Sequence, residues 1–174
     1  VMRTSLIGGL IANIKYNHAR KVSRIRVFEV GRVFLRDPAA PEGPLSVGGL
    51  RQPMRIAAAA YGPAGEAWDA APRAVDFFDV KADLENLIAP LSARFETRPH
   101  PAFHPGRSAR VIIEGAESGW IGELHPKWQQ KYGLPQAPVL FELDAEPLQT
   151  VPAPRPAVPS DQPTVVRDIS MLFA

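Results

Sequence analysis

The 174-residue chain contains no cysteine, which excludes disulfide bonds and thiolate metal sites. No apolar run reaches the roughly 18 residues that a membrane-spanning helix needs, and the first residues lack the pattern of a signal peptide. A glycine-rich phosphate loop and the Gly-x-Ser-x-Gly turn of serine hydrolases are also missing. We therefore expect a cytoplasmic protein with no membrane partner and without either of these common sites.

The composition is that of a globular domain, with 45% hydrophobic and 22% charged residues. Five of the 19 prolines fall within residues 151–163, where they are incompatible with a central strand or a helix interior. The sequence therefore predicts a core domain over residues 1–150, a proline-rich linker over 151–163, and the truncated start of another domain over 164–174. Because apolar patterns are interrupted at both ends, we expect a piece of a longer protein.

Positive charge is concentrated near the start of the chain. Residues 1–36 contain eight Lys or Arg and a single acid, Glu29, which gives a formal charge of +7, whereas the whole chain carries +2. Such a segment either binds RNA or another anionic partner or forms a solvated, arginine-rich helix face. The candidates for facing a partner here are Arg3, Arg20, Lys21 and Arg24.

Apolar periodicity predicts two longer helices and one short one. The first follows Thr4 and Ser5, either of which could cap it, becomes regular after Gly9 and ends near residue 20. Asp76 is expected to cap the second, which Pro90 ends. The short helix covers residues 127–132, between a proline and a glycine that suit its two ends.

Runs of β-branched and aromatic residues predict the strands. They cover residues 24–35, 55–61, 94–98, 109–114, 119–124 and 139–144, and a Pro/Gly loop separates the first two. Short turns between several of these runs suit hairpins. The expected fold class is therefore α+β, with an antiparallel β-sheet flanked by helices.

Residues 103–109 contain His104, Arg107 and Ser108. A serine near a histidine is compatible with nucleophilic catalysis, although no acid is placed to orient the histidine. The alternative is that Pro105-Gly106 forms a turn into a strand that begins at Ala109. In that case His104 and Arg107 bond to the turn or face a partner, and we count both as interface candidates.

Other groups admit a functional and a structural interpretation. Asp76, Asp79 and Asp83 share one helix face and could bind magnesium, but acids also stabilise a helix start. The four histidines lack the spacing of zinc ligands. The three tryptophans could stack on nucleic-acid bases or pack inside the protein.

Residues 28–37 are similar to the second signature motif of class II aminoacyl-tRNA synthetases. In that motif the strand ends in Phe-Arg-x-Glu, and the arginine contacts the α-phosphate of ATP, where its planar fork neutralises developing charge. Here Leu35 follows Phe34, and Arg36 is one position late, which turns its side chain to the opposite face of a strand. Nothing after Leu143 matches the third signature motif, Gly-x-Gly-x-Gly-x-x-Arg.

Taken together, the chain resembles the C-terminal half of the bacterial phenylalanyl-tRNA synthetase β subunit. The resemblance rests on six segments in family order: Met2–Leu6, Phe28–Phe34, Val75–Lys81, Phe103–Ala109, Ile121–Pro126 and Val165–Ile169. It covers most of the chain, and Ala82 departs from the glycine usual after the third segment. The last segment resembles the start of a ferredoxin-like anticodon-binding domain.

The resemblance implies a class II-like domain that has lost its catalytic residues and supports assembly with the catalytic α subunit in an α2β2 heterotetramer. The whole enzyme would charge tRNA(Phe) using ATP and magnesium, while this piece would bind neither cofactor and would contribute no catalytic residue. Two other interpretations stay open. One is an RNA-binding module that uses the basic N-terminal segment, and the other is an active nucleotide-binding enzyme with a degenerate site.

Overall fold

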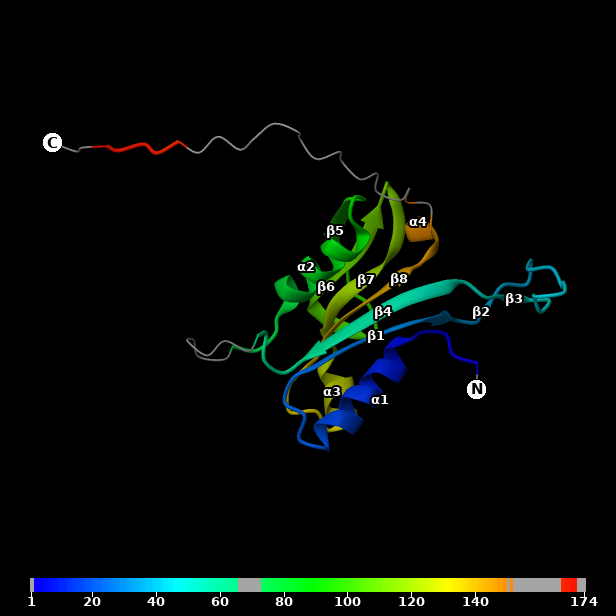
Figure 1. Cartoon of the computed structure of the whole chain (residues 1–174). Helices are drawn as coiled ribbons and strands as arrows, with labels where there is room; N and C mark the ends of the chain where they lie inside the picture. Colours follow the sequence, from blue (N-terminus) through cyan, green and yellow to red (C-terminus); the bar gives the residue numbers. More distant parts are fainter. Residues whose placement is uncertain (1, 66–72, 150, 152–166, 172–174) are drawn as a thin grey trace.

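The computed structural model describes residues 2–65, 73–149, 151 and 167–171. In this part of the chain an antiparallel sheet has the strand order β1-β4-β8-β7-β6-β5 (Figure 1). Its strands are β1 (Ile25–Arg32), β4 (Met54–Tyr61), β5 (Ala93–Thr97), β6 (Phe103–Ile113), β7 (Ala116–Leu124) and β8 (Val139–Asp144). A separate pair, β2 (Leu35–Arg36) and β3 (Leu50–Arg51), forms an arm that projects beyond the sheet.

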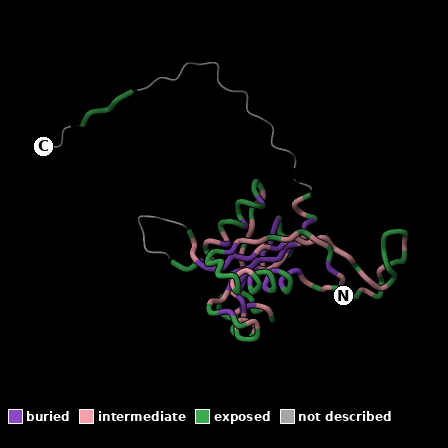
Figure 2. The backbone as a smooth tube through the Cα atoms, turned by 60° about the horizontal axis from the view of Figure 1, so that its bottom comes forward, coloured by how far each residue is buried: buried purple, intermediate pink, exposed green. Residues whose placement is uncertain are grey.

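Helices cover both faces of the sheet and create two apolar cores. Helices α1 (Ile7–His18) and α3 (Pro126–Tyr132) pack on one face, and α2 (Phe77–Ile88) packs on the other. The short α4 (Glu146–Gln149) follows β8. Buried backbone is concentrated in the sheet, and the outer sides of the helices are exposed (Figure 2). The expected α+β class, with helices flanking an antiparallel sheet, is confirmed.

Helix α2 begins and ends where the sequence predicts. Asp76 is its N-cap, and its carboxylate accepts hydrogen bonds from the backbone N–H of Phe78 (2.8 Å) and of Asp79 (3.1 Å). The Asp79 carboxylate accepts in return from the Asp76 N–H at 2.9 Å, which completes a capping box. The helix ends at Ile88, just before Pro90. These bonds engage two of the three acids considered as magnesium ligands, Asp76 and Asp79.

Asp79 also makes α2 sensitive to acid. Hydrogen bonding from Arg73, at 2.6 and 2.7 Å, lowers the pKa of Asp79 from 3.8 to about 2. Because the folded-state pKa is depressed, this stabilisation is complete above the unfolded pKa near 4 and disappears as the pH falls through about 2.

We expect Asp79→Ala to lower the free energy of unfolding by about 1–2 kcal/mol at pH 6, a value reduced by the exposure of Arg73. The loss should shrink steadily as the pH falls below 4. Urea unfolding at pH 6, 4 and 3 measures it. Asp79→Asn keeps an acceptor for the Asp76 N–H and is the control for charge alone. A loss that does not change with pH would contradict this role of the ion pair.

The start of α1 differs from the prediction. The helix begins at Ile7 and includes Gly8 and Gly9, whereas we expected regular helix only after Gly9. The residue at the cap position is Leu6, which offers no side-chain oxygen, but the Ser5 hydroxyl accepts from the Ile7 N–H at 3.1 Å, so Ser5 contributes locally to this helix start. The Leu6 N–H donates to the buried carboxylate of Glu142 in β8, at 2.7 Å. A tertiary contact thus supplements the local one.

Strand β6 also differs, because it begins at Phe103 and not at residue 109. Phe103 pairs with Leu124 and Ser108 with Gly122, so five steps along β6 match two along β7. Residues 104–107 therefore form a bulge within the strand, and the predicted turn at Pro105-Gly106 is wrong. A bulge is one of the few places where a sheet accepts proline, which has no N–H to donate.

The remaining elements lie close to their predicted ranges. Strand β1 ends at Arg32, and the chain resumes as β2 at Leu35, so the predicted strand over 24–35 is two strands. Helix α3 has Pro126 at its first position and Gly133 in the left-handed conformation at its end, as expected. No helix in the described ranges is long and apolar enough to span a membrane. The predicted linker falls almost entirely outside the described residues.

Candidate functional site

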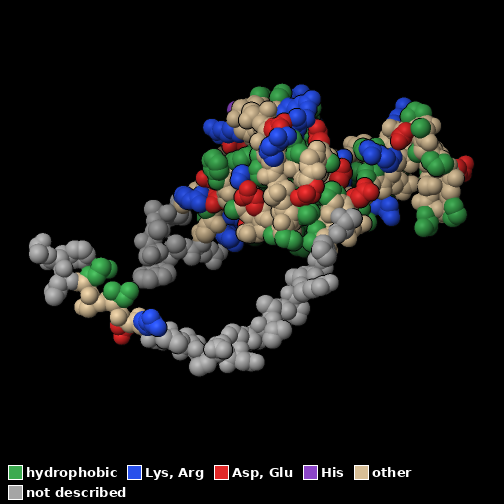
Figure 3. All heavy atoms as spheres, turned by 90° about the horizontal axis from the view of Figure 1, so that it is seen from above, with side chains coloured by type: hydrophobic (Ala, Val, Ile, Leu, Met, Phe, Trp, Pro, Cys, Tyr) green, Lys and Arg blue, Asp and Glu red, His purple; other side chains and the backbone are tan. Residues whose placement is uncertain are grey.

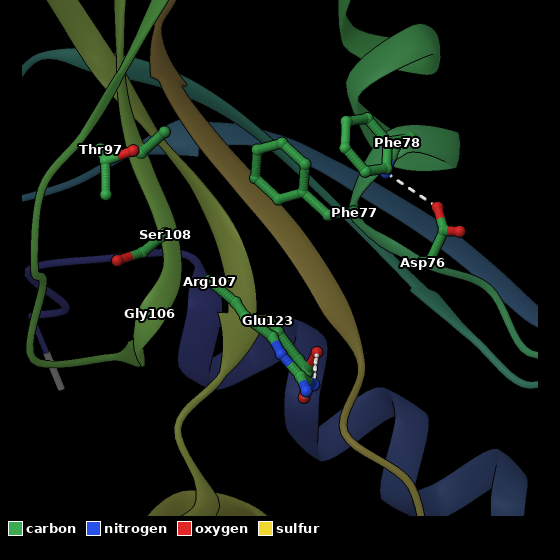
Figure 4. Close-up of a pocket in the computed structure, with 9 residues that line it drawn as sticks. Asp76, Phe77, Phe78, Thr97, Gly106, Arg107, Ser108 and Glu123 are labelled. Carbon is green, nitrogen blue, oxygen red and sulfur yellow. Dashed lines mark hydrogen bonds and ion pairs between the residues drawn. The ribbon is translucent and has the colours of Figure 1, made fainter.

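A hollow of about 410 Å³ lies between the bulge of β6 and the start of α2 (Figure 4). Its lining combines polar and aromatic side chains: Asp76, Phe77, Phe78, Thr97, Arg107, Ser108 and Glu123, together with the backbone of residues 106 and 109. This is where the structure brings the central motif of residues 103–109 next to the helix that begins at Phe77. It is therefore the first place to look for chemistry.

The charged groups of this hollow already bind one another. Arg107 Nη1 donates to both carboxylate oxygens of Glu123, at 3.0 and 2.8 Å, across the β6–β7 pair. Asp76 points back to its own helix and accepts from the Phe78 N–H (Figure 4). Arg107 is still 61% exposed, so it can face a partner, but only as half of an ion pair.

His104 and Ser108 do not form a catalytic pair. The Ser108 hydroxyl is buried and donates to the Arg98 carbonyl at 2.8 Å. His104 Nδ1 accepts from the Gly106 N–H at 3.1 Å, within the bulge. Because each side chain bonds to backbone and not to the other, the geometry offers no activated nucleophile. His104 therefore stabilises the bulge. A bond from this histidine to nearby backbone is what the non-catalytic interpretation predicted.

Two motif segments, on the neighbouring strands β6 and β7, meet in a packing contact. Phe103 is fully buried, and it lies against Gly122 of β7. A Cβ at Gly122 would stand 2.9 Å from the Phe103 ring and 2.9 Å from the Arg107 carbonyl oxygen, closer than carbon atoms can approach. The glycine of one segment therefore makes room for the phenylalanine of the other. In the same region His125 Nδ1 accepts from the Lys127 N–H at 3.0 Å and caps α3.

A second pair of segments is joined by Arg3. Its guanidinium lies over Gly31, forms an ion pair with Glu29, and donates through Nε to the Arg32 carbonyl at 3.3 Å. Arg3 thus links the segment before α1 to β1. Arg3 precedes α1, whereas Arg20 and Lys21 follow it. A helix of 12 residues is about 18 Å long, so the two ends are separated by about that distance. The interface candidates of the first 36 residues therefore do not form one site.

The most buried acid, Glu142 on β8, was not singled out from the sequence. Its carboxylate accepts from the Leu6 N–H, from the Ser5 hydroxyl at 3.1 Å and from Arg55 Nη1 at 3.1 Å. Arg55 also donates to Asp144 at 3.1 Å. The one sequence signal for Glu142 is its position at the centre of an apolar strand. A carboxylate at such a position is expected to be buried and therefore to need charged or polar partners. The cluster anchors α1 to the sheet.

Next to this cluster His100 packs its ring on Phe103 and Trp120, with centroid distances of 5.1 and 4.8 Å. Burial lowers the pKa of His100 below its usual 6.5; the charge of Glu142 opposes this shift, and that of Arg55 adds to it. A neutral imidazole fits this aromatic contact better than a charged one. Its Nδ1 accepts from the Ala102 N–H at 3.3 Å, so this histidine also supports local structure.

Where the class II motif would place an arginine, Leu35 is partly buried against the α1 core, whereas the neighbouring Arg36 is exposed. The alternation of a strand accounts for this difference, as the sequence predicted. Arg36 lies on the projecting arm, where β2 pairs only with β3. Among the described residues, no arginine therefore occupies the position that the class II motif assigns to the phosphate-binding arginine.

A basic surface forms where α1 meets α3. We define it by five residues that make no ion pair among the described residues: Lys15, Arg20, Lys21, Lys127 and Lys131. Residues 7–28 and 124–141, which build this end of the molecule, contain no acid. Figure 3 shows the side away from α1 and α3, where acidic and basic side chains are interspersed.

Two aromatic rings belong to the same basic surface. Arg20 lies over the ring of Tyr16, 3.3 Å from its centroid, and Lys127 and Lys131 lie 5.4 and 5.2 Å from the centroid of Trp128. Tyr16 is 57% exposed. The sequence indicated Arg20 and Lys21 but not the two lysines of α3, because only the fold brings them close. The acid-free run of residues 124–141 is the signal that could have found these lysines. Arg24, the third candidate, lies instead beside the acids of α2, in a hollow that Asp76, Asp79 and Asp83 also line.

Comparisons with known proteins agree on one family. Residues 1–145 match the family model described as "Phenylalanyl tRNA synthetase beta chain CLM domain". The chain is 55% identical over 173 residues to a protein of Ralstonia nicotianae, 54% identical to one of Burkholderia lata, and 50% identical to one of Bordetella parapertussis. Each is named phenylalanine–tRNA ligase beta subunit. These matches cover 98–99% of this chain but only 21–22% of the relatives, so the chain spans about a fifth of their length.

Proposed function

Since this chain belongs to the phenylalanyl-tRNA synthetase β-chain family, we propose that it is a non-catalytic, class II-like domain from the C-terminal half of the β subunit. Its function is to act as a rigid scaffold, built on the antiparallel sheet, that assembles with the catalytic α subunit into an α2β2 enzyme. That enzyme attaches phenylalanine to tRNA(Phe). The domain's own contribution is shape and surface.

One observation carries the proposal: the side chains of the motif segments are used to hold the fold together. Arg3 joins Glu29, Phe103 fills the space left by Gly122, and Asp76 caps α2. A catalytic domain keeps some of its polar groups free and aimed at a common point, where substrate binds. In the described residues these groups instead bond to backbone or to each other, which suits a scaffold.

The described residues do not fit ATP and magnesium. Leu35 stands where the phosphate-binding arginine belongs, and Asp76 and Asp79 are engaged in the capping box of α2. Asp83 lies 3.4 Å from Arg26. We therefore assign no step of the reaction to this domain. ATP and magnesium are proposed to bind elsewhere in the enzyme.

Arg36 provides the direct test of catalytic silence. In the assembled enzyme we expect Arg36→Ala to leave phenylalanine-dependent ATP–pyrophosphate exchange unchanged, within about twofold. Removing one group that stabilises a transition state typically costs about 10²–10³ in rate. Arg51→Ala, on the neighbouring strand of the same arm, is the matched control. A loss of two orders of magnitude for Arg36→Ala alone would favour an active, degenerate nucleotide site.

RNA binding is a second candidate function, and the basic surface favours it. Five cations without an ion-pair partner among the described residues, together with the exposed ring of Tyr16, suit a phosphate backbone and a stacked base. On this proposal the surface contacts tRNA within the assembled enzyme, so the two functions are compatible.

Charge removal tests this second function. We expect the combined substitution Arg20→Ala, Lys21→Ala and Lys127→Ala to weaken tRNA binding about tenfold or more and to reduce the slope of log affinity against log salt by about 1 per lost phosphate contact. Fluorescence titration between 50 and 200 mM salt measures both. Arg94→Ala with Arg98→Ala, which removes two ion-paired arginines, is the control. Equal effects of the two sets would exclude a specific RNA surface.

A further inference from the structure

A second hollow, of about 450 Å³, lies on the face of the sheet that α1 and α3 cover, away from the hollow at the β6 bulge. It opens between the start of α1, the loop before β6 and helix α3, and we call it the α1–α3 hollow. Its apolar and aromatic lining includes Ile7, Ile11, His100, Leu124, Trp128 and Tyr132. A cavity of this size, built from several elements and lined mainly by such side chains, is typical of small-molecule sites.

One side of the α1–α3 hollow is polar, and its acidic group is already in use. The Glu142 carboxylate lines this side but accepts hydrogen bonds from the Leu6 N–H, the Ser5 hydroxyl and Arg55. Arg55 lies between Glu142 and Asp144, so two negative charges oppose its single positive charge. Among the described residues that line the hollow, no cation is therefore free to hold a phosphate or a carboxylate, and an anionic ligand does not suit the site.

Three hydrogen-bond donors of the hollow remain unused. His100 Nδ1 accepts from the Ala102 N–H at 3.3 Å, so the proton of the neutral ring lies on Nε2. Within the described part of the chain, His100 Nε2, Arg55 Nη2 and the Tyr132 hydroxyl make no hydrogen bond. None of the three atoms is sealed from solvent. Donors without acceptors favour a ligand that presents a carbonyl oxygen.

Gly8 gives an independent indication of a ligand. It lies in α1 and lines the hollow, although glycine costs a helix up to about 1 kcal/mol relative to alanine. The neighbouring Gly9 is constrained by its surroundings, because a Cβ there would stand 3.3 Å from a carboxylate oxygen of Glu29. At Gly8 no described atom outside the helix's own backbone lies within 4 Å of the Cβ position. The fold therefore leaves open space at Gly8, and this space borders the hollow.

We propose that the α1–α3 hollow binds a small, planar aromatic molecule that carries an uncharged carbonyl group. The ring packs against the apolar and aromatic walls, which include Ile11, Leu124 and Trp128, and the carbonyl oxygen accepts from the unused donors. This site goes beyond the scaffold role, because it adds a ligand to a domain whose proposed contribution is shape and surface.

Titration calorimetry on the assembled enzyme, with naphthalene-1-carboxamide as the probe, tests the proposal. We expect saturable binding that Gly8→Met weakens at least about tenfold, because the methionine side chain occupies the open space beside the hollow. Ala12→Met is the matched control, since Ala12 is exposed on the next turn of α1 but does not line the hollow. This variant should bind the carboxamide as the parent does. Circular dichroism should show that both variants are folded.

Two further probes examine the polar contact. Tyr132→Phe removes a hydroxyl and keeps the ring, so it should weaken carboxamide binding by about twofold to tenfold and leave binding of 1-methylnaphthalene unchanged. Naphthalene-1-carboxylate, which is anionic, should bind the parent at least about tenfold more weakly than the carboxamide. Equal effects of Tyr132→Phe on the carboxamide and on 1-methylnaphthalene would contradict a carbonyl group at this position.

Three other results would overturn the proposal. Carboxamide binding that both methionine variants weaken equally, or that neither weakens, would place the probe outside the hollow. Binding of the carboxylate as tight as that of the carboxamide would make the hollow an anion site. Absence of saturable binding would mean that the hollow takes no ligand of this class in the assembled enzyme.

Discussion

Glu142→Ala is expected to remove about 3–5 kcal/mol of stability, the range measured when one partner of a buried ion pair is deleted. The Glu142 side chain is 8% exposed and accepts three hydrogen bonds, from Leu6, Ser5 and Arg55. Without it the half-buried guanidinium of Arg55 loses its inner partner, and the N–H of Leu6, which precedes α1, loses its acceptor. Because domains of this kind are stable by only about 5–15 kcal/mol, the variant should be close to unfolding.

Urea unfolding at pH 7, followed by circular dichroism, measures this loss. Asp144 is the outer acid bound to Arg55, and its side chain is 41% exposed. Asp144→Ala should therefore cost less than about 1 kcal/mol. Proteolysis should also cut first near residues 2–18 in the Glu142 variant, because this acid holds α1 to the sheet. Similar losses for the two variants would contradict the anchoring role of Glu142.

Gly119→Ala is expected to prevent folding or to cost more than about 3 kcal/mol. Gly119 lies in β7 with a φ of +156°, and it pairs with Leu143 of β8. A Cβ there would stand 2.1 Å from the Glu142 carbonyl oxygen and 2.8 Å from the Leu143 Cα. Both are backbone atoms in the middle of the sheet, so neither can move aside without separating the strands.

Gly115→Ala is the matched control. Gly115 also has a positive φ, +84°, but it lies in the β6–β7 turn with open space around its Cβ position. That substitution should cost about 1 kcal/mol, because the conformation alone is strained. Yield after expression and the thermal midpoint measure both. If Gly115→Ala were as damaging as Gly119→Ala, strain and not the close approach of the strands would be the cause.

The sequence predicts best the elements whose ends are determined locally. Helix α2 is correct at both ends because Asp76 and Pro90 act through their own backbone neighbourhood. Helix α3 is correct for the same reason. The start of α1 is predicted only in part, because Ser5 acts locally whereas Glu142, which accepts from the Leu6 N–H, is 136 residues away along the chain. Such a tertiary partner leaves no local pattern.

The functional surfaces show the same limit. The bulge in β6 depends on how β6 pairs with β7, so the sequence of residues 103–109 alone suggested a turn. The basic surface needs α3 beside α1, and no single segment encodes that arrangement. The family resemblance could be found earlier, because it depends only on the order and spacing of motifs.

The central claim is that this domain assembles with the catalytic subunit and performs no chemistry itself. Size-exclusion chromatography with light scattering, on a mixture of this chain and a phenylalanyl-tRNA synthetase α subunit, tests it most directly. The account predicts a single peak whose mass corresponds to a defined ratio of the two chains. Separate elution of the α subunit both from this chain and from a version extended at its N-terminus would contradict it.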